Sequence, residues 1–263
     1  MRLSRPNELC YPKWTMCSRH RDCAMLQIFS LKLITANLPR PQPPAASGIE
    51  IYGFMAARDL LDPMRNYVFN QASPYRRPVL LEYDMRIKTG EGKQQDVPLI
   101  QGVAIFSNKI SGRAFTTQIT GGDHGAAAAV VEINHARFPR ALEATVQVKI
   151  IELTKQQQDN NNGGLDLSIT GFVPKIPEDI RLFRGVVDGP CELDRFVVAV
   201  ASNSYLILRF ETPCDVDGSK CVGRFAFRAT PHGCITDRRK FDLATIEVKV
   251  TWSNLITYPD DML

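Results

Sequence analysis

The residues most able to do chemistry lie near the N-terminus. Cys10, Cys17, His20 and Cys23 offer three thiols and one imidazole, which are donor types that bind zinc. Their spacing, Cys-x6-Cys-x2-His-x2-Cys, matches no standard zinc finger or knuckle, and no second half of such a motif follows. We therefore interpret them as part of an N-terminal tail, and we predict no metal and no cofactor for the chain.

Two polar loops also resemble sites by composition. Segment 121–125 (GGDHG) contains Asp123 and His124, an acid and a base, but no serine or cysteine in a nucleophile-elbow context accompanies them. Segment 215–219 (DVDGS) resembles the start of a calcium loop, yet Ala226 stands where an EF-hand requires glutamate. We interpret both segments as turns, although loop aspartates would gather calcium if the fold brought them together: Asp59, Asp62, Asp215 and Asp217.

Segment 49–70 (IEIYGFMAARDLLDPMRNYVFN) begins with strand-like alternation and ends in a polar turn. Asp62 precedes Pro63, and a residue before proline is disfavoured in helical conformation. Arg58 and Asp59 are placed to pair with each other or to cap the turn. We name Arg58, Asp59 and Asp62 as an interaction or structural motif, and we predict no catalytic residue.

Charge and cysteine content narrow the class of protein. The formal net charge is +4, and residues 1–23 carry +3 of it because five basic side chains there face two acidic ones. The near-neutral remainder lacks the electrostatic footprint of a phosphate-backbone binder. Seven irregularly spaced cysteines, without an apolar leader, indicate reduced thiols and an intracellular location, cytoplasmic or nuclear. Apolar runs of about six residues predict no membrane-spanning helix, which needs about 20.

The elements that must position any site are predicted to be β-strands, because apolar and polar residues alternate along them. The alternation is clearest in 78–88, 141–153 and 241–252. About 11 to 13 short strands, without a long amphipathic helix between them, predict a mainly β fold, an antiparallel β-sandwich or Greek-key barrel with few short helices. We expect a disordered basic, cysteine-containing tail over 1–25, a single β-rich domain over 26–255 and a C-terminal tail over 256–263.

Three blocks, taken in order, resemble a plant family expanded in grasses and known as domain of unknown function 6598. They are IYGFMAARDLLDPMRNYVFN, VLLEYDMRIK and FDLATIEVKVTWS, and the similarity runs over about 26–253. Family members usually have a longer segment between the first two blocks, where this chain has only 71–77. We therefore expect a strand or loop to be missing there and a sheet edge to be open.

The resemblance implies a setting in plant stress or defence. Related cereal domains occur behind an RNA N-glycosidase domain, whose helical Glu-Ala-x-x-Arg segment is absent here: Gln147 stands where the arginine would follow Glu143. We expect a non-catalytic binding module with an unidentified protein partner. The alternatives are a nucleic-acid or ribosome-associated accessory domain, and an enzyme of unrecognised type. The sequence indicates no oligomeric state.

Overall fold

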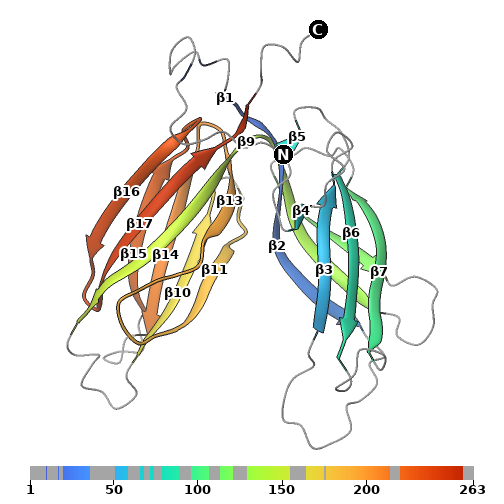
Figure 1. Cartoon of the computed structure of the whole chain (residues 1–263), viewed down its shortest axis with the longest axis horizontal. Coiled ribbons are helices and arrows are strands. Elements are labelled where there is room, and N and C mark those ends of the chain that lie inside the picture. The colour runs from blue at the N-terminus through green and yellow to red at the C-terminus, as the bar shows by residue number, and fades with distance from the viewer. Residues whose placement is uncertain are drawn as a thin grey trace, which may run out of the picture. The chain divides into compact units, whose positions relative to one another are not determined.

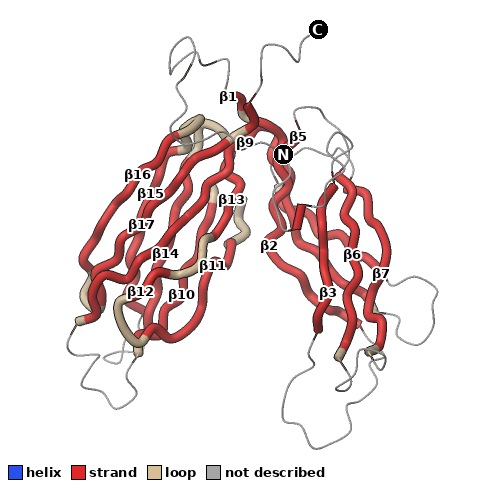
Figure 2. The backbone as a smooth tube through the Cα atoms, in the orientation of Figure 1, coloured by secondary structure: helices blue, strands red, loops and turns tan. Residues whose placement is uncertain are grey.

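A computed structural model describes most of the chain as antiparallel β-strands joined by loops (Figure 2). Within the described ranges there is no helix, and so none long and apolar enough to cross a membrane. The predicted mainly β fold is confirmed, and its packed antiparallel sheets are those of a β-sandwich. The described residues are 10, 17, 20–35, 51–58, 66–67, 72–73, 79–88, 96–106, 113–120, 129–154, 164–174, 176–213 and 220–256.

The chain forms two compact units, each described here by itself. Unit 1 comprises residues 1–25 and 138–263, and unit 2 comprises residues 26–137. The strand pattern of the sequence predicts one domain over 26–255. A disordered tail is expected over 1–25, but the structure places β1 (His20–Arg21) and the start of β2 (Cys23–Thr35) in the last part of this range. β1 pairs with β18 (Leu255–Ile256) close to the C-terminal end of unit 1.

Unit 1 consists of two sheet layers (Figure 1). One layer is a four-stranded antiparallel sheet in the order β11-β10-β14-β15. The other contains β16, β17 and the second half of β9, with β12 and β13 also pairing with β9. Their bounds are β9 (Val130–Leu153), β10 (Leu165–Phe172), β11 (Ile180–Val187), β12 (Cys191–Glu192), β13 (Phe196–Ala201), β14 (Tyr205–Pro213), β15 (Lys220–Arg228), β16 (Gly233–Lys240) and β17 (Ala244–Ser253).

The core of unit 1 follows from the alternation in its strands. In the β9–β17 pair, Val146 lies opposite Val250 and Val148 opposite Val248, and all four side chains are fully buried. Each such burial contributes roughly 1.5–3 kcal/mol before the ordering entropy is counted. The alternating residues between them, such as Lys149, point out of this core. The strands predicted over 141–153 and 241–252 are therefore confirmed, with one face buried.

A short turn carries the chain from one layer of unit 1 to the other. β13 belongs to the layer of β9, and β14 belongs to the four-stranded sheet. The amide of Ser204 donates to the carbonyl of Ala201, and Asn203 has a positive φ of 60°. Asparagine tolerates this left-handed conformation better than most residues, which fits it to such a tight reversal.

Unit 2 also has two layers of strands. One is β4-β3-β6-β7, and the other contains β8, the first half of β9, β2 and β5. Leu81, Tyr83 and Ile87 of the predicted strand 78–88 are buried in a core cluster to which both layers contribute. The bounds are β3 (Ile51–Arg58), β4 (Asn66–Tyr67), β5 (Ala72–Ser73), β6 (Val79–Ile87), β7 (Val97–Phe106) and β8 (Ala114–Thr120).

Position 53, in the first family-like block, requires a glycine. Its φ is +135°, and a Cβ there would overlap the backbone carbonyl of Asp84 on the neighbouring strand β6. A side chain is therefore excluded both by conformation and by space. In segment 71–77, the structure places β5 beside β2, and residues 74–78 lie outside the described ranges.

Candidate functional site: an arginine-bearing sheet face

A row of arginines crosses the outer face of the four-stranded sheet in unit 1. Thr170 of β10 lies opposite Arg181 of β11 on one side and Arg209 of β14 on the other, and Arg209 lies opposite Arg224 of β15. Residues directly opposite each other in antiparallel strands present their side chains to the same face. The strand spacing makes this arginine row about 14 Å long.

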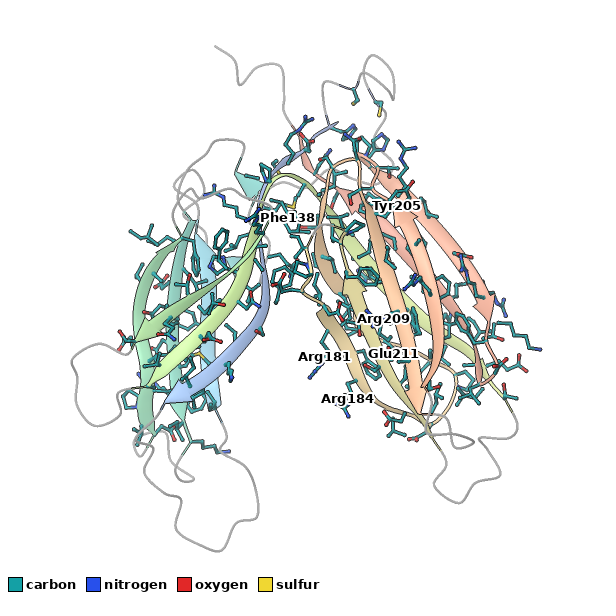
Figure 3. All side chains as sticks on the ribbon, turned by 180° about the vertical axis from the view of Figure 1, so that it is seen from behind. Phe138, Arg181, Arg184, Tyr205, Arg209 and Glu211 are labelled. Carbon is teal, nitrogen blue, oxygen red and sulfur yellow. The ribbon has the colours of Figure 1, made fainter. Side chains whose placement is uncertain are left out.

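A second row lies beside the arginine row on the same face. Ser168 of β10 is opposite Arg184 of β11 and Glu211 of β14. Figure 3 labels Arg181, Arg184, Arg209 and Glu211 on this sheet. The other face of the sheet is apolar and buried, because Ile169, Phe210 and Phe225 alternate with these polar residues.

Arg209 is held at the centre of the face by its neighbours. Its guanidinium lies 3.4 Å from a carboxylate oxygen of Asp179 and 3.6 Å from one of Glu211. Arg209 and Arg224 also lie over the ring of Phe172, with their Cζ atoms 5.4 and 5.8 Å from its centroid. Cation–π contacts of this kind orient the planar guanidinium groups, and the edge of Arg224 remains available to a ligand.

The positive charges of the remaining arginines on the face have no ion-pair partner among the described residues. Within the described part of the chain, no carboxylate forms an ion pair with Arg181, Arg184, Arg224 or Arg228. Arg228 lies opposite Tyr205, whose side chain is 47% exposed. We call this surface the arginine face; its arginines outnumber its carboxylates, which are Asp166, Asp179 and Glu211.

A polar hollow of about 320 Å³ lies on the arginine face. It presents the guanidinium groups of Arg181 and Arg184, the hydroxyls of Ser168 and Thr170, and the three carboxylates of the face. Guanidinium forks bind carboxylates or phosphates through paired hydrogen bonds, and hydroxyls add further donors. The hollow is therefore suited to an anionic group that brings some donors of its own.

A second, more apolar hollow of about 240 Å³ opens between the layers of unit 1. Leu165, Phe210, Phe241 and Ile246 line it, with Lys240 at its edge. Its volume is below the roughly 300 Å³ at which small-molecule sites begin. We therefore place the candidate site on the arginine face.

The structure brings together three of the four N-terminal metal-ligand candidates. The Sγ atoms of Cys10 and Cys17 lie 3.9 and 3.1 Å from Nδ1 of His20. His232, between β15 and β16, joins them with its Nε2 atom 2.5 Å from Sγ of Cys10. Burial, together with the hydrogen bond that the Cys10 thiol makes to Cys17 and the negative charge of a Cys17 thiolate, raises the pKa of Cys10 to about 11. Cys23 belongs instead to β2, where it is buried.

The other sequence-predicted site residues are not brought together by the described structure. Arg58 ends β3 opposite Leu80, and Asp59 and Asp62 lie outside the described residues. The loops at 121–125 and 215–219 also lie outside them, so the calcium arrangement is not described. Glu143 lies in strand β9, as the sequence pattern indicates, and it accepts a hydrogen bond from Ser253 at 3.0 Å.

Sequence reasoning did not find the arginine face, and it did not connect His232 with the N-terminal cysteines and histidine. Each strand places its arginines on one face by alternation, but the arginines of different strands meet only through the register between strands. His232 is 212 residues beyond His20, so no local spacing connects them.

Comparisons with solved structures give only distant similarities. A structure of two C2 domains of extended-synaptotagmin 2 shares 7% identity with a TM-score of 0.30, covering 98% of this chain and 99% of that one. Human GIVD cytosolic phospholipase A2 shares 10% identity with a TM-score of 0.28, covering 89% of this chain and 33% of that one. No curated protein matches the chain.

The family comparison is more direct. A family model described as a domain of unknown function matches residues 25–251. These residues include both sheet layers of each unit, and with them the arginine face. The chain therefore belongs to the domain of unknown function family DUF6598.

Proposed function

We propose that the protein is a non-catalytic binding module whose arginine face recognises an acidic segment of a partner protein. The arginine row is the observation that carries this proposal: Arg181 and Arg224 lie at its two ends without carboxylate partners in the described chain. Guanidinium groups are more weakly hydrated than ammonium groups, which favours their use in interfaces.

The carboxylates of the face favour a peptide over a continuous phosphate backbone. Asp166, Asp179 and Glu211 line the same hollow as Arg181 and Arg184. They would repel the unbroken row of phosphates in a nucleic-acid backbone, whereas an acidic peptide also supplies backbone N–H groups that can donate to these carboxylates. From the family resemblance, we also propose that the module acts in a plant stress or defence response. From the interpretation of its cysteines as reduced thiols, we propose a location inside the cell, in the cytoplasm or nucleus.

Binding of a fluorescein-labelled, glutamate-rich dodecapeptide to the full chain tests this function. We expect the double variant Arg181→Gln/Arg184→Gln to weaken binding at least about tenfold, because each hydrogen bond to a charged group contributes roughly 1.5–3 kcal/mol. Arg195→Gln is the matched control, since Arg195 is exposed on the connection between β12 and β13. Equal affinity of the wild type and the double variant would reject the arginine face as the site.

A second candidate is a nucleic-acid accessory domain, and one observation favours it. Tyr205 is exposed beside Arg228, and Phe172 lies under two guanidinium groups on the same open sheet. Aromatic and arginine side chains on a four-stranded sheet are used to stack single-stranded bases.

Salt-titrated binding of an oligouridylate, with and without residues 1–23, separates the two functions. RNA binding that falls steeply with salt and is lost in Tyr205→Ala would favour the accessory domain. Absent or salt-insensitive RNA binding, with retained peptide binding, would favour the protein-binding module.

A further inference from the structure

We propose that Cys10, Cys17, His20 and His232 form a structural zinc site. The four side chains come from two regions of unit 1 that are distant in sequence. Cys10, Cys17 and His20 belong to the N-terminal segment, and His232 belongs to the turn between β15 and β16. The ion would therefore cross-link the segment before β1 to this turn through its ligands.

Three of the four donor atoms already lie at the scale of a tetrahedral zinc site, and the fourth, Sγ of Cys17, lies beside His20. One atom each of Cys10, His20 and His232 lies within 4.8 Å of the others. Zinc bonds of about 2.3 Å to sulfur and about 2.0 Å to nitrogen put neighbouring S and N ligands roughly 3.6 Å apart. The distances from His20 Nδ1 to Cys17 (3.1 Å) and to Cys10 (3.9 Å) bracket that value. The distance of 2.5 Å from Cys10 Sγ to His232 Nε2 is shorter and must increase by about 1 Å when the ion enters.

Two of the ligands are held by ordered backbone. His20 lies in β1, opposite Ile256 of β18, and its side chain is only 4% exposed. The hydroxyl of Thr230 donates to the carbonyl oxygen of His232 at 3.1 Å and so fixes the turn. The two imidazole rings lie side by side, with centroids 4.3 Å apart and planes inclined by 31°. Such placement lets both rings reach one ion with little loss of conformational freedom.

The chemistry of this donor set selects zinc. Two thiolates and two imidazoles in a partly buried cluster are an S₂N₂ set, which favours tetrahedral zinc over the oxygen-seeking calcium and magnesium ions. Four protein ligands leave no open position for a substrate, so the role is structural.

Metal analysis of the full chain tests the site. We expect reduced protein purified with zinc, and then dialysed, to retain one zinc per chain. X-ray absorption should give two sulfur and two nitrogen ligands, and cobalt substitution should give the visible bands of a tetrahedral thiolate site. Cys10→Ser, Cys17→Ser and His232→Gln should each weaken zinc binding at least as much as the roughly 10- to 100-fold loss that follows a second-shell change.

Two cysteines provide matched controls. Cys234 is exposed in β16, two residues from His232, and Cys191 lies in β12, so Cys234→Ser and Cys191→Ser should keep the zinc. Zinc removed from the wild type by a chelator should return to one per chain on reloading, which separates metal binding from folding of the variants. The proposal fails if the reduced wild type does not bind zinc or cobalt, or if Cys10→Ser and His232→Gln bind zinc like the wild type. Neither result bears on peptide binding by the arginine face.

Discussion

Sγ of Cys10 lies 2.5 Å from Nε2 of His232, although 222 residues separate them in sequence. This contact joins the N-terminal segment to the turn that precedes β16. If a zinc ion binds this cluster only in the folded state, its binding stabilises unit 1 by mass action.

Removal of zinc should therefore lower the thermal stability of the wild type. We expect a chelator to decrease the midpoint of unfolding by at least roughly 5 °C, since 1 kcal/mol corresponds to about 2–4 °C in a chain of this size. Differential scanning calorimetry measures the change. In His232→Gln the midpoint should not respond to the chelator, whereas in Cys234→Ser it should respond as in the wild type. A chelator response in His232→Gln equal to that of the wild type would place the stabilising ion elsewhere.

Glu211 should limit binding to the arginine face. Its carboxylate lies 3.6 Å from Arg209 and is a competitor for any anionic ligand. We expect Glu211→Gln to increase affinity for the glutamate-rich dodecapeptide by roughly two- to fivefold, the range of a partly exposed ion pair. Fluorescence anisotropy measures the gain, and Glu192→Gln on β12 is the control. Reduced affinity in Glu211→Gln would mean that this carboxylate itself contacts the ligand.

The strands of this fold could be predicted because burial leaves a period-two pattern in the sequence. Val146, Val148 and Ile150 are buried, and Lys149 between the last two is exposed, as alternation requires. The same pattern predicted that Leu81, Tyr83 and Ile87 face a core. Such a pattern gives the face of each residue but not its cross-strand neighbour.

The candidate sites depend on those neighbours. Arg181, Arg209 and Arg224 meet because of register across four strands, including an irregularity of pairing next to Thr170. Likewise, the spacing from Cys10 to His20 matched no known motif because His232 comes from a remote turn. Long-range pairing of this kind leaves no local signal in one sequence.

Gly223 should be required for packing in unit 1. A Cβ at this position would lie 2.6 Å from the ring of Phe241, which packs edge-on against the buried Phe225. We expect Gly223→Ala to reduce the free energy of unfolding by about 1–3 kcal/mol, the usual cost of overpacking a core. Urea unfolding, followed by tryptophan fluorescence with Trp252 fully buried in unit 1, measures the loss.

Gly189 provides the control for that substitution. No atom lies within 4 Å of a Cβ built there, so Gly189→Ala should change stability by less than about 0.5 kcal/mol. Similar losses in the two variants would show that contact with Phe241 does not govern the effect.

His135 should make unit 2 sensitive to acid. Its side chain is 8% exposed, lies edge-on to Phe106 with ring centroids 4.5 Å apart, and has Nε2 2.9 Å from the hydroxyl oxygen of Thr117. Burial lowers the pKa of His135 from 6.5 to about 4, because the protonated ring loses its hydration. The folded state therefore binds the proton less readily than the unfolded state, and acid favours unfolding.

The stability that depends on the uncharged His135 ring is fully present above pH 6.5, and it is lost as the pH falls from 6.5 towards 4. The shift corresponds to about 3 kcal/mol. Hydrogen exchange of the β8 amides, corrected for intrinsic rates, should show a decrease of that order in the opening free energy of the wild type between pH 7 and pH 4. His135→Gln cannot become charged and should show a clearly smaller decrease. If the two proteins lose protection in parallel, carboxylate protonation and not His135 would account for the acid sensitivity.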